Sequence, residues 1–282
     1  MTKPFDEFNY WFIYKDINYH TIIKKENNQI LGEISNSGVI IFYDANHNMF
    51  DDTSIPEEFE EYKKRHEYLI GQPVSVYGVE FVEAKNSYIN LLTGALMCRA
   101  VKNQKIPENH LNYINQIINW IESTDFYESP ASTIYHESFP HGLLYHTLVV
   151  YNKMIELYQI PTFKGKVDIE SATICCLMHD WCKIGLYEQY KKNVKNEQTG
   201  QWERVDAYRR KSFPHSFGHG VTSMFMAMKF VKLTEEEALA IRWHMSMFNV
   251  ASNEINEYQQ SCEQYPLVHL IQFADQLSIT SY

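Results

Sequence analysis

The sequence has no CxxC pair, and its five cysteines are an odd number at irregular spacings. This pattern excludes a disulfide framework and is typical of a protein in a reducing compartment. No stretch reaches the roughly 18 consecutive apolar residues that a membrane-spanning helix needs. The first residues, MTKPFDEFNYWFIY, are acidic where a secretory signal would be basic, and they contain no clean apolar segment. We therefore expect a soluble, cytoplasmic protein.

An excess of positive charge is missing as well. Lys and Arg number 25 against 35 Asp and Glu, which gives a formal net charge of −10. This balance argues against a protein whose main task is to hold long nucleic acid through its phosphates. It leaves room for a small nucleotide, or for a strand end in a local pocket where a metal ion supplies positive charge. Repeats and low-complexity tracts are also absent, and 282 residues suffice for one large domain or two modest ones.

Residues 1–105 predict a small domain that is α+β or rich in β-structure. The segments QILGEI and GVIIFYD are separated by SNSG, and together they predict a hairpin. Residues 55–70 have apolar residues at helical spacing, whereas residues 71–84 alternate like a strand. His20 and His47 have no neighbouring ligand partners and are interpreted as surface histidines. We find no motif in this part that carries chemistry.

Residues 106–282 predict a mostly helical domain, so the expected fold class is α+β overall. Amphipathic segments favour helices at 111–121, 141–158, 168–184, 215–231, 233–248 and 266–279. Thr234 opens a capping-box pattern, while Pro214 precedes one helix and Pro266 starts another. The polar segment 187–211 interrupts the helices and predicts a hairpin, or a loop over the functional site.

Metal-capable side chains lie on the apolar faces or at the ends of several of these helices. They are His146, His179, Asp180, His219, His244 and Asp275. Any one of them alone would more often be a hydrogen-bonded core residue. Four histidines and two aspartates that face one interior need a common charge, and divalent cations provide it. The adjacent pair His179-Asp180 follows the apolar run ICCLM, where an unpaired aspartate would be costly.

The order H…HD…H…H…D resembles the HD-domain superfamily of metal-dependent phosphohydrolases. The resemblance covers about residues 120–280 and rests on the phrases GLLYHT, LMHDWCKIG and FADQLS. Within this superfamily, DFYESPASTIYHESFPHGLLYHTLVVY is similar to the start of the HD region of YhaM-type 3′-5′ exoribonucleases. One departure is His141-Gly142, where the family often has Gly-Gly. Another is the amino-terminal part, which we do not match to the OB-fold of those exoribonucleases.

The resemblance implies a role for each residue of the set. The four ligands of the basic HD metal site are matched by His146, His179, Asp180 and Asp275. The further histidines of two-metal members are matched by His219 and His244, and Asp180 would then bridge the two ions as a catalytic residue. Lys183 matches the catalytic lysine that approaches the substrate phosphate.

Phosphoester hydrolysis needs a nucleophile at neutral pH and a way to neutralise charge on the phosphoryl oxygens. Two divalent cations about 3.5–4 Å apart supply both, because they activate a water and bind the phosphate. Mixed His and Asp ligands suit Mn²⁺, Fe²⁺, Co²⁺, Ni²⁺ or Zn²⁺, whereas Mg²⁺ alone prefers oxygen ligands. Lys183 lies one helical turn after Asp180, so its ammonium can neutralise a phosphate oxygen or help the leaving group. The alternative for Lys183 is a solvated residue near a helix end.

A second set of residues is predicted to contact the substrate. It comprises His136, His141, His215, Arg209, Arg210 and Arg242. His136 and His141 precede the first ligand helix and can instead orient a ligand. The charge run that begins at Arg209 can equally be a solvated face, and His215 can be an exposed residue at a helix start. The cysteines around the His-Asp pair are interpreted as small hydrophobic residues without a chemical role.

The sequence thus predicts a metal-dependent phosphohydrolase whose substrate is a nucleotide or the 3′ end of single-stranded nucleic acid. The phrase similarity favours an exonuclease, whereas the acidic charge favours a mononucleotide or another small phosphoester. A catalytically silent HD-fold binding or regulatory module is the alternative from another class, although the complete ligand set argues against it. A helical protein with structural His–Asp pairs is a third alternative. It predicts that chelators change neither activity nor stability.

Overall fold

The structure is a computed structural model that describes residues 70–76, 78–102, 110–212 and 217–279, and the backbone of five short strands before residue 51. The chain divides into two compact units. The first comprises residues 1–70 and 93–119, and the second comprises residues 71–92 and 120–282. Helices α3 (Phe81–Lys102) and α4 (His110–Glu122) each contribute to both units. The domain boundary expected near residue 105 lies between these helices, outside the described residues.

The described strands of the first unit form small antiparallel sheets. Strand β1 (Ile23–Lys24) pairs with β2 (Gln29–Ile30), and β4 (Ile40–Tyr43) lies between β3 (Glu33–Ile34) and β5 (Met49–Phe50). The pairing of β3 with β4 confirms the hairpin predicted around SNSG. The two histidines interpreted as surface residues, and nearly all of the helix predicted at 55–70, lie outside the described residues.

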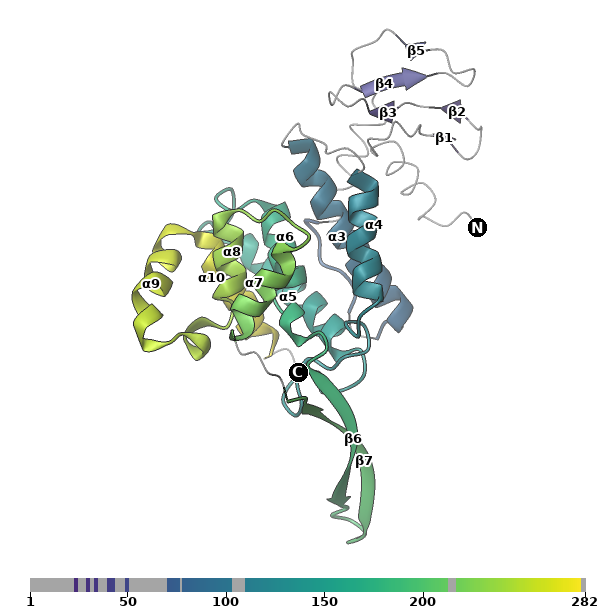
Figure 1. Ribbon diagram of the computed structural model, residues 1–282, viewed down its shortest axis with the longest axis vertical. Helices are drawn as coiled ribbons and strands as arrows, with labels where there is room; N and C mark the ends of the chain where they lie inside the picture. The colour runs from purple at the N-terminus through teal and green to yellow at the C-terminus, as the bar shows by residue number, and fades with distance from the viewer. Residues whose placement is uncertain are drawn as a thin grey trace. The chain divides into compact units, whose positions relative to one another are not determined.

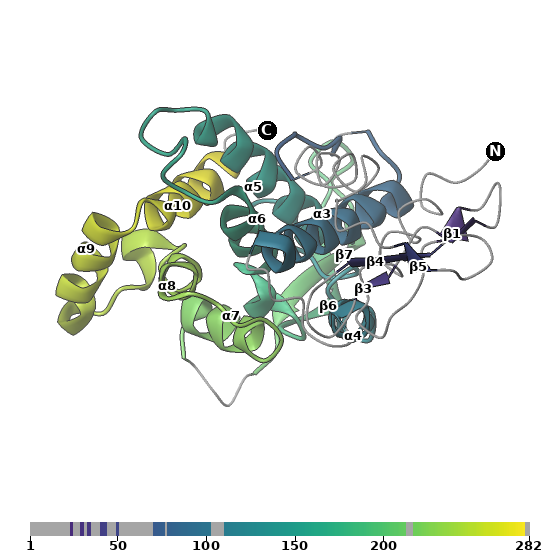
Figure 2. The same cartoon turned by 90° about the horizontal axis from the view of Figure 1, so that it is seen from above.

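The second unit is a group of helices packed around α6 (Ile169–Met178). Against α6 lie α5 (Gly142–Tyr158), α7 (His219–Met228), α8 (Glu235–Arg242) and α10 (Pro266–Ser278). Every side chain of α6 from Ala172 to Met178 is buried, as expected for a short helix that is apolar all round. Helix α9 (Ile255–Gln264) packs against α10, and Figure 2 shows α10 alongside α5.

Most helices predicted for the carboxyl-terminal part are present. Helices α4, α5, α6, α8 and α10 confirm five of the predicted segments, and the mostly helical structure agrees with an α+β fold class. The capping box of α8 is formed, because Thr234 Oγ1 accepts a hydrogen bond from the Glu237 amide and Glu237 Oε2 accepts one from the Thr234 amide. Helix α7 begins at His219, and the residues just before its expected start lie outside the described part. None of the described helices is long and apolar enough to cross a membrane.

The strand predicted at 71–84 is wrong. Residues 73–76 have no regular secondary structure, and helix α3 begins at Phe81. The side-chain amide of Asn152 on α5 forms the backbone hydrogen bonds that a neighbouring strand would form. Its Oδ1 accepts a hydrogen bond from the Val74 amide, and its Nδ2 donates one to the Val74 carbonyl oxygen, both at 2.8 Å. The backbone of Val74, in the segment with alternating valines, is therefore hydrogen-bonded by a side chain from a helix and not by a neighbouring strand.

The polar segment between the helices forms a long antiparallel hairpin, as one of the two predicted alternatives. Strand β6 (Tyr187–Lys195) pairs with β7 (Trp202–Arg210) over its full length. In the connecting loop, Asn196 Oδ1 accepts hydrogen bonds from the amides of Gln198 and Thr199. Figure 1 shows the hairpin extending away from the helices of its own unit.

Candidate metal centre

The predicted HD pair lies where the central helix ends. His179 follows the last residue of α6, and its side chain is fully buried. Asp180 comes next, and Lys183 is the last residue of the short 3₁₀-helix η1 (Trp181–Lys183). Both Asp180 and Lys183 are buried. Trp181 is held in place because its Nε1 donates to Tyr88 Oη, which in turn donates to the Leu177 carbonyl oxygen.

Four other elements bring the remaining predicted ligands to the same place. His146 lies on α5, Asp275 on α10, His219 at the start of α7, and His244 two residues after α8. His146, His244 and Asp275 are buried, and His219 is half-buried. The structure therefore brings together the six residues that the sequence separates by up to 129 positions, although their role as ligands stays a prediction.

Two of the imidazole rings are oriented by backbone carbonyls. His179 Nδ1 lies 2.7 Å from the Cys176 carbonyl oxygen, and His244 Nδ1 lies 2.8 Å from that of Ile241. A carbonyl oxygen can only accept, so each Nδ1 carries a proton, and in the neutral ring each Nε2 presents a lone pair. The Nε2 atoms of His179, His244 and His146 are buried and have no hydrogen-bond partner within the described residues. Buried polar atoms without a partner are costly, and a cation would satisfy all three.

The two carboxylates stand close to these lone pairs. Asp180 Oδ2 lies 3.4 Å from Nε2 of both His146 and His179. Asp275 Oδ1 lies 3.3 Å from His146 Nε2 and 3.8 Å from His179 Nε2. These contacts have ion-pair distances without hydrogen-bond geometry. His146, His179 and Asp180 form a group that can hold a metal ion, with ligand atoms all within 4.8 Å of one another.

The second oxygen of Asp180 faces a different set of side chains. Asp180 Oδ1 lies 3.6 Å from His244 Nε2 and 4.0 Å from Cys182 Sγ. Cys182 Sγ in turn lies 3.2 Å from Nδ1 of His219. Asp180, Cys182 and His219 form a second group that can hold a metal ion. Asp180 is thus common to two candidate sites, as a bridging carboxylate would be.

The charges of the site favour added positive charge. Asp180, Asp275 and Glu137 are three buried carboxylates; Lys183 pairs with Asp180, and His146 lies near all three. Burial alone would lower the pKa of His146, but the surrounding carboxylates outweigh it and raise that pKa well above its usual value. His244 has a raised pKa for the same reason. Without a metal ion, the site holds protons more tightly than free imidazole does.

The carboxylates show the opposite shift. Burial would raise the pKa of Asp275, but the nearby imidazoles, His146 first, lower it to about 2. Burial opposes ionisation of Asp180 too, yet Lys183 and His179 hold its pKa well below the usual value. Lys183 Nζ lies 2.5 Å from Asp180 Oδ2, and this contact raises the lysine pKa despite its burial. Both carboxylates are therefore ionised at neutral pH, as metal ligands must be.

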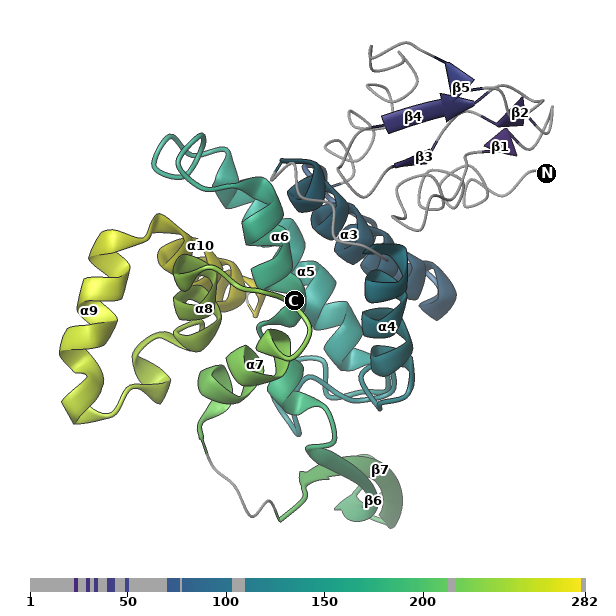
Figure 3. The ribbon, with the colours of Figure 1, turned by 45° about the horizontal axis from the view of Figure 1, so that its top comes forward.

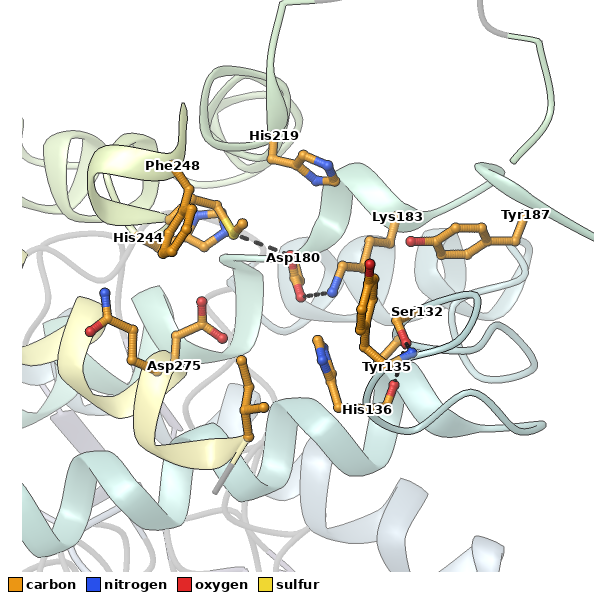
Figure 4. Close-up of a pocket in the computed structure, with 14 residues that line it drawn as sticks. Ser132, Tyr135, His136, Asp180, Lys183, Tyr187, His219, His244, Phe248 and Asp275 are labelled. Carbon is orange, nitrogen blue, oxygen red and sulfur yellow. Dashed lines mark hydrogen bonds and ion pairs between the residues drawn. The ribbon is translucent and has the colours of Figure 1, made fainter. Parts of the chain in front are cut away.

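A cavity of about 460 Å³ opens beside the predicted ligands. Asp180, Lys183, His219, His244 and Asp275 line it, and Figure 4 shows their side chains around a common space. The remaining lining comprises Ala131, Ser132, Tyr135, His136, Tyr187, Met245, Phe248, Gln276 and Ile279. A cavity of this size accepts a ligand of about the size of a nucleotide.

The histidines predicted to contact substrate have different positions. His136 lines the cavity, and its ring centroid lies 4.7 Å from that of His146. Burial, with help from His146 and Lys183, lowers the pKa of His136 to about 4, so its ring is neutral at neutral pH. His141 is not among the residues that line the cavity. Its ring stacks on Phe81, and its Nδ1 lies 2.6 Å from the Tyr127 carbonyl oxygen.

The arginines predicted to contact the substrate also have different positions. Arg209 Nε donates to Glu188 Oε1 at 2.7 Å, and Arg242 forms an ion pair of 2.6 Å with Glu254. Arg210 lies at the end of β7, directly opposite Tyr187 of the cavity wall. His215 lies outside the described residues. A role of these residues in substrate binding stays a prediction.

Several residues at the site have no counterpart in the sequence predictions. Glu137 is buried, and its Oε2 lies 3.6 Å from His146 Nδ1. Tyr187 lines the cavity near Lys183, and Tyr88 supports Trp181 from helix α3. Cys182 was interpreted as a hydrophobic residue, yet its sulfur lies between two predicted ligands. Proximity in space distinguishes these residues, and no local spacing in the sequence signals it.

Two glycines allow the ligand helices to approach their neighbours. A Cβ on Gly142 would overlap the carbonyl oxygen of Glu137, and a Cβ on Gly220 would overlap that of Arg242. Gly142 precedes the helical turn that carries His146, whereas Gly220 follows His219 directly. His141 has φ 69°, a left-handed conformation that favours glycine, which explains why Gly-Gly suits this turn.

Comparison with protein-family models, with curated proteins and with solved structures finds no match to this chain.

Proposed function

We propose that this protein is a metal-dependent phosphohydrolase of the HD type. The substrate is a phosphoester of a nucleotide or of the 3′ end of single-stranded nucleic acid. The proposal is carried by one observation. Three buried imidazole Nε2 atoms, which have no hydrogen-bond partner in the part of the chain that the structure describes, converge on two ionised carboxylates. A purely structural cluster would satisfy these atoms with donors and acceptors from the protein itself.

The donor set fits divalent transition metals. Imidazole nitrogens with carboxylate oxygens suit Mn²⁺, Fe²⁺, Co²⁺, Ni²⁺ or Zn²⁺ better than Mg²⁺. His146, His179, Asp180 and Asp275 would hold one ion, and Asp180, His219 and His244 a second. Bound cations supply a water of lowered pKa and neutralise charge on the phosphoryl oxygens.

Lys183 is the residue placed to bind the phosphate. Its ammonium is buried, charged and directed into the cavity, where its partner within the described residues is Asp180. A phosphate oxygen in this cavity would share the ammonium with Asp180, and the charge-assisted hydrogen bond would strengthen as negative charge grows. His136 is neutral, so it can donate or accept a hydrogen bond at the same phosphate without adding charge.

The cavity rim supports a substrate with an aromatic base. Tyr135 and Phe248 line the cavity, and their side chains are 83% and 88% exposed. Exposed aromatic rings beside a phosphate-binding site are suited to stack on a nucleobase. This feature favours a nucleotide unit over a non-nucleotide phosphoester.

The test combines metal content with turnover. Wild-type protein, loaded with Mn²⁺, is incubated with a panel of nucleotides and with 5′-labelled single-stranded RNA and DNA. The variants are Asp180→Asn, Asp275→Asn and, as a matched control on the same helix as Asp275, His269→Gln. His269 is not among the cavity-lining residues. We expect hydrolysis and bound metal in wild type and His269→Gln, and a loss of both by at least about 100-fold in the other two.

The alternatives give different results in this experiment. Stoichiometric metal without hydrolysis of any substrate would favour a silent HD-fold binding module. Absence of bound metal in wild type, with stability unchanged by chelators, would favour structural His–Asp pairs and contradict the proposal. Shortening of the labelled strands from the 3′ end would identify an exonuclease, whereas release of phosphate or nucleoside from nucleotides alone would identify a nucleotidase.

A further inference from the structure

The two faces of the β6–β7 hairpin differ in chemistry. Residues directly opposite each other in an antiparallel pair project from the same face, and every second pair shares it. The register therefore gives one face a row of aromatic and cationic side chains. We call this row the basic–aromatic stripe; its members are Tyr187, Arg210, Tyr208, Arg204, Lys195 and Trp202. Gln189, Asn193 and the ion pair of Lys191 with Asp206 complete the same face.

The opposite face of the hairpin has no such excess of positive charge. Arg209 is paired with Glu188 at 2.7 Å and lies over the ring of Tyr190 at 5.3 Å. Val194, Val205 and Ala207 are apolar, and Lys192 and Glu203 complete the face. On the stripe, Arg204, Lys195 and Arg210 form no ion pair within the described part of the chain. This local excess of positive charge occurs in a protein whose net charge is −10.

The stripe begins at the candidate metal centre. Tyr187 lines the cavity, and Arg210 is its direct partner across the hairpin. Trp202 lies at the far end of the hairpin and is 71% exposed. Nine residues at about 3.3 Å each separate the two ends by about 30 Å. Figure 3 shows the β6–β7 hairpin projecting from the helices of its unit on the side of α7.

We propose that the basic–aromatic stripe binds single-stranded nucleic acid whose end enters the cavity. The inference rests on the proposed function, since it assigns the substrate of that site. Bases stack on Tyr208 and Trp202, and phosphates contact Arg204, Lys195 and Arg210. Same-face side chains recur about every 7 Å along a strand, an interval that suits the repeat of an extended polynucleotide. The right-handed twist of the hairpin turns the stripe gradually about its axis.

The presence of both rings and cations on one face is what favours a polynucleotide over an acidic peptide. A peptide with carboxylates would use the cations but gains little from the exposed ring of Trp202 and the half-buried ring of Tyr208. Each nucleotide offers both a phosphate charge and a base that stacks on any aromatic face, irrespective of sequence. The acidic charge of the whole chain then limits binding of long nucleic acid to this arm.

The test measures binding and not turnover. The full-length protein in EDTA is titrated against a fluorescent single strand of about 12 nucleotides, and anisotropy is recorded at several salt concentrations. The stripe variants are Trp202→Ala, Lys195→Glu, and the double variant Lys195→Glu with Arg204→Glu. The matched control is Lys192→Glu, which makes the same charge change as Lys195→Glu on the opposite face.

We expect Trp202→Ala to weaken binding about tenfold, from loss of stacking on one base. The double variant should weaken it more than tenfold and reduce the slope of log K against log salt by about 0.7 for each lost phosphate contact. Lys192→Glu should stay within about twofold of wild type, because phosphates would follow the other face. Equal losses in Lys192→Glu and Lys195→Glu would show non-specific attraction and overturn the proposal.

A second measurement distinguishes this inference from the proposed function. Hydrolysis of a small phosphodiester without bases, bis(4-nitrophenyl) phosphate, is measured with Mn²⁺ for the same variants. Retained hydrolysis with lost strand binding is the expected result. Wild-type hydrolysis without strand binding would overturn the stripe alone, whereas strand binding without any hydrolysis would overturn the proposed function alone. If the stripe variants instead change the oligomeric state in sedimentation and leave strand binding intact, the face is a protein interface and the proposal is wrong.

Discussion

Asp180 has two carboxylate oxygens with different neighbours. One faces His146 and His179 and receives the ammonium of Lys183, and the other faces His244 and Cys182. Because each oxygen faces a different group of side chains, this carboxylate is suited to bridge two cations. Because Asp180 is buried, its ion pair with Lys183 affects the free energy of unfolding as well as the chemistry of the site.

Replacing Asp180 with Asn should destabilise the metal-free protein by about 3 kcal/mol, because Lys183 then becomes a buried charge without its partner. The double variant with Lys183→Met should regain part of this loss, since it removes the unpaired charge. Urea unfolding in EDTA measures both free energies. Equal stability of the wild type and Asp180→Asn would show that this ion pair contributes nothing.

Cys182 is the ligand candidate that the sequence analysis dismissed. Burial and the charge of Asp180 raise its thiol pKa to about 12, so a bound metal must displace the proton before sulfur can coordinate. In Co²⁺-loaded protein we expect a thiolate-to-metal charge-transfer absorption that disappears in Cys182→Ser. Cys175→Ser is the matched control, because Cys175 Sγ lies against the Glu237 carbonyl oxygen, 3.7 Å away. Absence of this band in the loaded wild type would exclude sulfur from the site, whereas a band that survives in Cys182→Ser would exclude Cys182 as its source.

The elements of the second unit could be predicted to different degrees. Helices α5 and α10 each have an apolar face that includes a metal-capable residue, so both the helices and their candidate ligands could be predicted from spacing. The prediction of a strand at 71–84 was wrong because alternating valines are typical of a strand. Asn152, which satisfies the backbone at Val74, lies 78 positions away, and no local pattern reveals it. Helix α9 was missed because its sequence, INEYQQSCEQ, is too polar to show a clear apolar stripe.

The candidate site residues also could be predicted to different degrees. His179, Asp180 and Lys183 come from one short phrase, whereas Glu137 and Tyr187 reach the site only through the fold. The hairpin was predicted, but which of its side chains share a face depends on the register. A shift of one residue would place Arg209, and not Arg210, with Tyr187.

Gly220 controls how closely α7 approaches the end of α8. A Cβ at this position would overlap the Arg242 carbonyl oxygen, so Gly220→Ala must push the two elements apart. We expect a loss of about 1–3 kcal/mol in the free energy of unfolding, together with weaker metal binding, because His219 and His244 move with these elements. Chemical denaturation and metal content measure the two effects. Met228→Ala, at an exposed position of the same helix, should change neither, and an unchanged Gly220→Ala protein would contradict the close contact.

At the scale of the whole molecule, the candidate site joins distant parts of the second unit. Helices α5, α6, α7 and α10 and the segment after α8 all contribute to it, so any cation bound there links the bundle. Without metal, Lys183 pairs with Asp180, and His146 lies near Asp180, Asp275 and Glu137. A metal ion that binds the folded bundle adds stability by mass action.

Addition of Mn²⁺ or Zn²⁺ at about 100 times its dissociation constant should stabilise the protein by about 2.7 kcal/mol, and EDTA should reverse the change. Thermal unfolding then shifts upward by several degrees, at about 2–4 °C per kcal/mol for a chain of this size. His146→Gln and His179→Gln should lose the shift, and His269→Gln should keep it. A shift that persists in the first two variants would place the metal elsewhere.

The β6–β7 hairpin contains no buried side chain. Substitutions along it leave the helical core untouched and change little in the stability of the fold. The hairpin is therefore free to vary in sequence, whereas the candidate ligands, nearly all of them buried, are constrained by packing. Evolution, or an engineer, could alter what the proposed stripe binds without disturbing the candidate metal centre at its base.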